Sequence, residues 1–273
     1  MAVGDDDVLN VLRWQVGSRT IRDARRSIPA AQFQPFPPFP GAAAPVPVVS
    51  RSEFGGTGFT AVHLGDSPLH GYRVLSTIVV ETRRLLARGS TFVYAYYDGI
   101  DKVAHAHGLG EYYDAELQSV DRLVAEMAAL LPDAAVLVVT ADHGQVDVGS
   151  RVVLPGKELM SATRFISGEG RFRWLHAKPG AAKDLLVDAE ELHGETTWVR
   201  SRDQLVDDAW FGGPLRDGVA SRLGDVALIP HAPIAFLDPA DTGETRLAAR
   251  HGSLTSAEML VPLLCLAGDG TIA

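Results

Sequence analysis

The sequence FVYAYYDGIDKVAHAHG, at residues 92–108, joins a strand-like apolar run to a stretch that carries Asp101 and His105. The sequence VLVVTADHGQVD, at residues 136–147, repeats this arrangement with Asp142 and His143. Both apolar runs are short and rich in β-branched or aromatic residues, as buried strands require. Acidic and histidine side chains therefore follow two predicted strands directly.

On both sides of these two motifs, the chain alternates between strand-like and helix-like segments. Further short apolar runs lie at residues 46–49 and 226–229, and apolar residues at intervals of three and four predict helices over residues 75–87 and 113–131. This alternation predicts an α/β fold with a mostly parallel sheet flanked by helices. In such sheets ligands bind beyond the carboxyl ends of the strands, where both Asp and His pairs fall.

The spacing of these residues suits metal binding. Asp101 and His105 are four apart, so on a helical turn both side chains project from one face and can hold one ion. Asp142 and His143 are adjacent, and at an irregular junction each can point toward a different ion of a pair. Either motif alone occurs often by chance, and an isolated histidine is more often a hydrogen-bonded surface or core residue. Their joint occurrence after successive strands favours a metal site.

A third element lies near the C-terminus, in HGSLTSAEMLVPLL at residues 251–264. Here His251 precedes Gly252, which permits a tight turn, and a helix-like apolar tail follows. The remaining histidines are assigned to ordinary hydrogen bonding, except that His107, two residues after His105, could also face a substrate.

These ordered motifs, with VLNVLRW, VDRLV and SRLGDV between and before them, resemble the type I phosphodiesterase and nucleotide pyrophosphatase family of the alkaline phosphatase superfamily. The resemblance covers nearly the whole chain. It implies that Asp101, His105 and His251 hold one divalent ion, zinc in this family, and that Asp142 and His143 contribute to a second. It also implies a small-molecule phosphoester or nucleotide substrate.

This chain departs from the family pattern at the nucleophile. In family members an earlier aspartate and a Thr or Ser nucleophile complete the second site, and we expect this chain to begin after that N-terminally located segment. Ser50, Ser52, Thr57 and Thr60 are poor substitutes, because they match a stretch that family members carry in addition to the true nucleophile. The catalytic residue is therefore unknown. We expect an incomplete second site, and either a hydrolase that is inactive as this chain alone or a non-catalytic descendant that binds metal or nucleotide.

Composition restricts the class of ligand. The formal net charge of −9 and the pI near 5.4 argue against general binding to nucleic acid or to anionic membranes. No stretch is long and apolar enough to span a bilayer, and the acidic opening residues predict a cytoplasmic location. The single cysteine, Cys265, lies in an apolar run and is expected to serve packing.

The resemblance and the sequence pattern also predict the domain organisation. We expect a single alkaline-phosphatase-like domain over residues 1–273, N-terminally truncated, with a cap-like insertion at about residues 155–219 that covers the pocket and sets substrate preference. The proline-rich residues 33–47 predict a surface loop. An incomplete sheet would expose an unpaired strand edge, so self-association is also expected.

Overall fold

The computed structural model describes residues 1–4, 7–17, 22–239 and 246–268. The helices are α1 (Ala30–Phe33), α2 (Gly58–Leu64), α3 (Ser76–Ala87), α4 (Gly99–His107), α5 (Glu111–Ala128), α6 (Lys157–Ala162), α7 (Ala182–His193), α8 (Arg202–Asp207) and α9 (Ser256–Met259), with short 3-10 turns at Ser52–Phe54 and Ala220–Arg222. The strands are β1 (Ala2–Val3), β2 (Asp7–Asn10), β3 (Gln15–Val16), β4 (Arg22–Asp23), β5 (Val48–Arg51), β6 (Leu69–Tyr72), β7 (Tyr94–Ala95), β8 (Val136–Thr140), β9 (Val146–Asp147), β10 (Val152–Val153), β11 (Thr163–Glu169), β12 (Phe172–Ala177), β13 (Thr197–Ser201), β14 (Val226–Pro230), β15 (Ala235–Phe236), β16 (Ala249–Arg250) and β17 (Leu263–Ala267).

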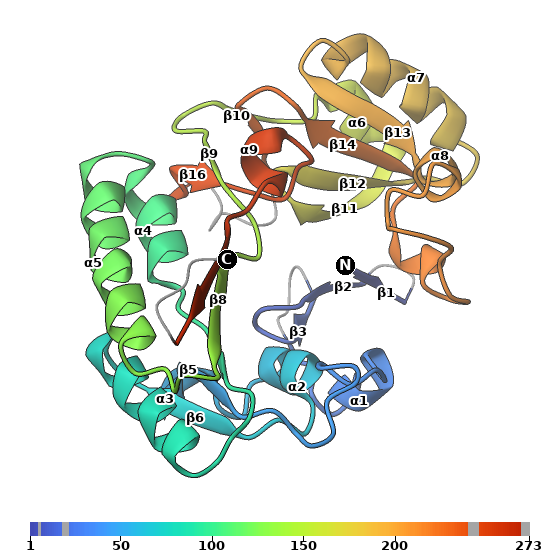
Figure 1. The fold of residues 1–273 in the computed structure, drawn as a ribbon. Coiled ribbons are helices and arrows are strands. Elements are labelled where there is room, and N and C mark those ends of the chain that lie inside the picture. Colours follow the sequence, from blue (N-terminus) through green and yellow to red (C-terminus); the bar gives the residue numbers. More distant parts are fainter. Residues whose placement is uncertain (5–6, 18–21, 240–245, 269–273) are drawn as a thin grey trace.

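A three-stranded parallel sheet forms the base of the molecule. β5 lies in its centre, with Val48 opposite both Leu69 of β6 and Tyr94 of β7. Helix α3 packs on this sheet, and the side chains buried between them include Val49, Tyr72, Ile78 and Leu85. Figure 1 shows α4 and α5 side by side along one flank of the molecule, with α3 at the lower end of that flank. The helices predicted at residues 75–87 and 113–131 are thus present as α3 and α5, and the strand predicted at residues 46–49 is present as β5.

β8 and β17 form a separate antiparallel ribbon, in which Thr140 lies opposite Leu263 and Val136 opposite Ala267. We predicted buried strands at β7 and β8, and that prediction is wrong for both. Val138 of β8 is 53% exposed and Tyr94 of β7 is 40% exposed. The reason is that, among the described residues, each of these strands pairs on one side only.

The prediction for the apolar segment after His251 is also wrong. The sequence suggests one helix-like tail, but α9 stops at Met259 and the chain continues into β17. Leu260 has an extended backbone and the next-but-one residue is Pro262, which lacks the amide proton that a continuing helix needs.

The segment predicted to form a cap folds into regular structure. β11, β12 and β13 come from residues 155–219 and form a four-stranded antiparallel sheet with β14, which follows that segment. Helices α6 and α7 lie on this sheet (Figure 1). The largest buried cluster of the described chain lies here, and it includes Leu159, Leu175, Leu185, Leu228 and Phe236.

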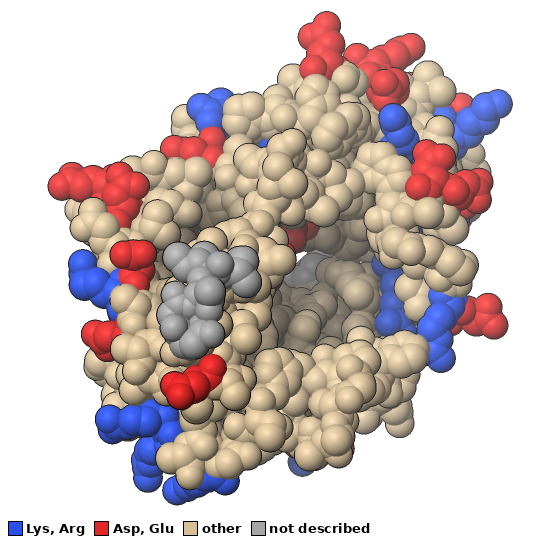
Figure 2. Space-filling view, in the orientation of Figure 1, with Lys and Arg blue, Asp and Glu red and all other residues tan. Residues whose placement is uncertain are grey.

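We call the antiparallel sheet with its helices α6, α7 and α8, at residues 155–230, the cap-like half, and a hollow separates it from the parallel sheet. Figure 2 shows this hollow in the middle of the molecule, with acidic surface in its upper wall. The N-terminal strands β1 to β4 pair antiparallel in chain order, and Figure 1 shows β1, β2 and β3 between α2 and β11. Among the described residues, none of the helices combines the length and the apolar character needed to cross a bilayer.

Candidate metal centre

Helix α4 presents the first two candidate ligands. Asp98 lies at its N-terminal cap and pairs with Arg51 and Lys102, and Gly108 ends the helix with a φ of 77°. Within the helix Asp101 and His105 lie one turn apart on one face, as their spacing predicts. The distance between His105 Nε2 and Asp101 Oδ1 is 3.2 Å.

The loop after β8 presents the second pair. Asp142 remains open to solvent, with 59% of its side chain exposed, whereas His143 is largely covered. The two side chains stay close, since His143 Nε2 lies 3.7 Å from Asp142 Oδ1. The turn is anchored by a hydrogen bond of 2.8 Å from the Gly144 amide to the carbonyl oxygen of Glu258 in α9.

His251 follows β16, which pairs with β9 and so returns the chain to the vicinity of the second loop. Gly252 has a φ of 117°, a conformation that L side chains rarely adopt, so glycine is needed for the turn after His251.

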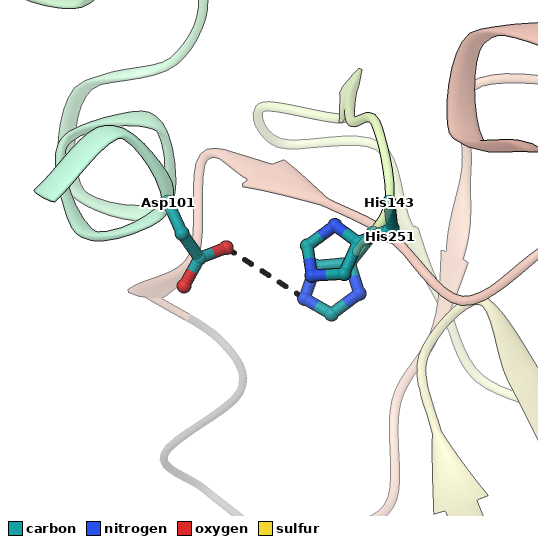
Figure 3. A group of neighbouring side chains, drawn as sticks. All are labelled: Asp101, His143 and His251. Carbon is teal, nitrogen blue, oxygen red and sulfur yellow. Dashed lines mark ion pairs between the residues drawn. The ribbon is translucent and has the colours of Figure 1, made fainter. Parts of the chain in front are cut away.

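Side chains from these three distant segments meet at one place. The donor atoms of Asp101, His143 and His251 all lie within 4.8 Å of one another (Figure 3). The His143 and His251 rings stack with centroids 3.5 Å apart, and His251 Nε2 lies 3.8 Å from Asp101 Oδ1. This grouping differs in detail from the resemblance, which assigns His143 to a second ion together with Asp142.

The hydrogen bonds around this group suit a divalent cation. His105 Nδ1 lies 2.8 Å from the Ala249 carbonyl oxygen and His143 Nδ1 lies 2.9 Å from that of Gly144. Because a carbonyl only accepts, both Nδ1 atoms carry a proton, and in the neutral rings both Nε2 atoms keep the lone pair that a metal requires. Gln145 donates to Asp101 Oδ1 at 2.6 Å, and its own buried Oε1 has no partner among the described residues.

The electrostatics of the group agree with this donor set. Burial, together with the nearby His143, lowers the pKa of His251 to about 4, so its ring is neutral at pH 7. The pKa of His105 is raised instead, because its Nε2 donates a hydrogen bond to the Asp101 carboxylate, and a cation at this site would displace that proton. Burial acts to raise the pKa of Asp101, but its hydrogen bond with His105 and the three neighbouring imidazoles bring it below the usual value. A carboxylate beside neutral imidazole is the state in which these side chains bind metal.

The sequence did not reveal Glu169, which ends β11 in the cap-like half. Its Oε1 lies 3.0 Å from where a Cβ at Gly252 would be, and it interacts electrostatically with His143 and His105. Its side chain is open to solvent but flanked by protein, and partial desolvation raises its pKa. No motif marks this residue, whereas Gln145 could have been found from its place directly after Asp-His-Gly.

The other candidates for a substrate-facing group or a nucleophile make contacts outside the metal centre. His107 is exposed and stacks on Tyr112, with ring centroids 4.2 Å apart. Thr57 caps α2 by accepting from the Thr60 amide, and the hydroxyls of these two residues bond each other. Ser52 donates to the Tyr72 carbonyl, and Ser50 is buried in β5.

Comparison with known proteins identifies the family. The sequence profile of the type I phosphodiesterase/nucleotide pyrophosphatase family matches residues 43–254. The chain belongs to this family. The predicted resemblance is therefore confirmed, and the chain has the scaffold of a phosphodiesterase or pyrophosphatase-type hydrolase. No curated protein matches the chain.

Solved structures confirm the alkaline-phosphatase-like α/β fold class. Phosphonoacetate hydrolase from Sinorhizobium meliloti 1021, in complex with phosphonoformate, aligns with a TM-score of 0.58 at 18% identity over 82% of this chain and 65% of that one. Murine ectonucleotide pyrophosphatase/phosphodiesterase 5 aligns with a TM-score of 0.58 at 14% identity over 83% of this chain and 62% of that one. The human counterpart aligns with the same TM-score at 12% identity over 96% and 70%. The family member described here thus spans less than two thirds of the first two of these chains.

Proposed function

We propose that this chain is a metal-dependent hydrolase of phosphodiester or nucleotide pyrophosphate bonds. It binds two divalent cations, zinc by preference, through Asp101, His105, Asp142, His143 and His251, and the second of these sites is the weaker. The observation that carries the proposal is the meeting of Asp101, His143 and His251 donor atoms within 4.8 Å. Membership of the family supports phosphoester chemistry at this place.

Each side chain has a distinct task in this proposal. Asp101 supplies negative charge and the imidazole Nε2 atoms supply neutral donors, while the Ala249 and Gly144 carbonyls hold two rings in the required tautomer. Gln145 keeps Asp101 in place. Bound divalent cations would polarise the phosphoryl oxygens and offset the charge of the leaving group. Zinc suits a mixed set of nitrogen and oxygen ligands.

The described residues offer little support for a nucleophile in this chain. The hydroxyls of Ser52, Thr57 and Thr60 are engaged in local hydrogen bonds. We therefore expect this chain to bind a cation and a phosphoryl group, with turnover near background. This observation favours a second candidate function, a non-catalytic metal- or nucleotide-binding descendant of the same scaffold.

We also propose that the cap-like half determines which substrates fit. A cavity of about 310 Å³ adjoins the candidate metal centre, with Asp142, His143 and His251 in its lining. Three aromatic residues of the cap-like half also line this cavity: Phe172, Trp210 and Phe211. Aromatic rings beside a phosphoryl site would stack on a planar apolar group of the substrate. The cytoplasmic location stays a prediction.

The test compares phenylphosphonate and methylphosphonate by calorimetric titration into the zinc-loaded chain. Both should bind only when zinc is present, and the phenyl compound should bind about tenfold more tightly, which corresponds to about 1.4 kcal/mol of ring contact. Trp210→Ala should remove most of that difference. Tyr112→Ala, which alters an exposed ring that does not line the cavity, should leave it unchanged.

Binding that is equally strong without zinc would refute the metal-dependent function. An unchanged preference for phenylphosphonate in Trp210→Ala would refute the role of the cap-like half but not the metal-dependent function. Hydrolysis of bis(p-nitrophenyl) phosphate separates the two candidate functions, because rapid zinc-dependent turnover would show that a nucleophile is present after all.

A further inference from the structure

A buried ion pair joins the cap-like half to α9. Arg171 lies between β11 and β12 and has 0% of its side chain exposed, and Glu258 of α9 has 1% exposed. Arg171 Nε donates to Glu258 Oε1 at 3.0 Å and Arg171 Nη2 to Oε2 at 2.6 Å. Arg171 Nη1 donates to the Ala232 and Ile234 carbonyls. The guanidinium is therefore held on two sides in one orientation.

Glu258 in turn contacts both histidine-bearing turns. Its Oε1 accepts from the Ser253 amide at 3.0 Å, two residues after His251. Its backbone oxygen accepts from the Gly144 amide at 2.8 Å, one residue after His143. Thr255 Oγ1 donates to Oε2 at 2.6 Å and closes the short turn before α9. One residue thus anchors the chain beside each of the two stacked rings.

The charge state of Glu258 fits this role. Burial alone would raise its pKa, but the hydrogen bonds from Arg171, Thr255 and Ser253 outweigh burial and lower it. The carboxylate is therefore ionised at neutral pH and accepts every hydrogen bond described for it.

A buried ion pair is a poor means of adding stability. Removing two charges from water costs several kcal/mol per ion, and well-packed apolar residues often stabilise a protein as much or more. In some proteins such a pair instead favours one arrangement of the groups around it, because each hydrogen bond requires a defined position. The groups around this pair are the two histidine turns and the β11–β12 hairpin, whose Glu169 approaches Gly252 and whose Phe172 lines the cavity.

We propose that Arg171 and Glu258 are positioning residues that fix the His143 and His251 rings relative to each other and to the cap-like half. The proposal rests on the metal site described above. Without the pair the chain keeps its fold, but the two imidazoles lose their common orientation and hold a cation less tightly.

Cobalt(II) is a suitable probe because its visible absorption reports the geometry of the ligands. Glu258→Gln should weaken Co²⁺ binding by about tenfold or more, the range found when groups that orient metal ligands are removed. It should also change the position or intensity of the visible band. Ser167→Ala is the matched control, since it removes a buried 2.8 Å hydrogen bond to His176 in the same cap-like sheet. That control should lower the unfolding temperature and leave the cobalt spectrum unchanged.

A second variant separates positioning from folding. Arg171→Met/Glu258→Leu replaces the charges by apolar groups and should retain the folded structure by circular dichroism while binding Co²⁺ as weakly as Glu258→Gln. If wild-type protein binds no Co²⁺, the metal site itself fails and this proposal fails with it. If wild-type protein binds Co²⁺ and folded Glu258 variants give the same affinity and spectrum, only the positioning role is overturned.

Discussion

Gly144 lies so close to the backbone of α9 that a side chain at this position has no room. A Cβ there would lie 2.1 Å from the Ala257 carbonyl oxygen, which is a backbone atom and cannot move aside alone. The sequence motif Asp-His-Gly predicted the neighbourhood of a metal site, but it gave no reason for the glycine. That reason depends on α9, which meets the motif only in the folded chain.

Gly144→Ala should therefore displace the turn that carries His143. We expect the free energy of unfolding to fall by about 1–3 kcal/mol, the usual cost of overpacking, and zinc affinity to fall with it. Urea unfolding and zinc titration measure the two effects. Gly110→Ala is the control, because a Cβ at Gly110 would meet no atom within 4 Å. If Gly144→Ala behaves like this control, the close approach to α9 has been misjudged.

At the scale of elements, the ribbon of β8 and β17 is the part that departs most from expectation. The residue types of β8 predict a buried strand, yet Val136 and Val138 are 59% and 53% exposed. Residue composition reports which side chains favour a covered sheet, but it does not report whether neighbouring strands are present to cover them. β14, with the same kind of sequence, is fully buried because it has strands on both sides.

This ribbon predicts self-association with a second copy of the chain. An unpaired strand edge beside exposed apolar side chains is a template for pairing between molecules. Sedimentation velocity over a range of concentrations should show oligomers, and Val138→Lys should shift the distribution toward monomer. Leu12→Lys alters a side chain that is 72% exposed outside the ribbon and should not. A monodisperse wild-type monomer at every concentration would be contrary to this expectation.

At the scale of the whole molecule, the site is assembled from segments that are far apart in the sequence. Spacing alone placed Asp101 and His105 on one helical face, and the family resemblance added His251. Neither indicated that His143 and His251 would stack, or that the cap-like half would reach the same place through Glu169 and Arg171. Those contacts depend on how β9 pairs with β16 and on where α9 lies, which short motifs do not encode.

The most direct test of the central claim is the zinc content and zinc affinity of the purified chain, measured by elemental analysis and competition with a chelator. The structure predicts one tightly held zinc, and at least a tenfold loss of affinity in each of Asp101→Asn, His143→Ala and His251→Ala, because the first removes the negative charge of the group and the other two each remove an imidazole donor. A chain that retains no zinc, or one in which these three substitutions leave the affinity unchanged, would contradict the account.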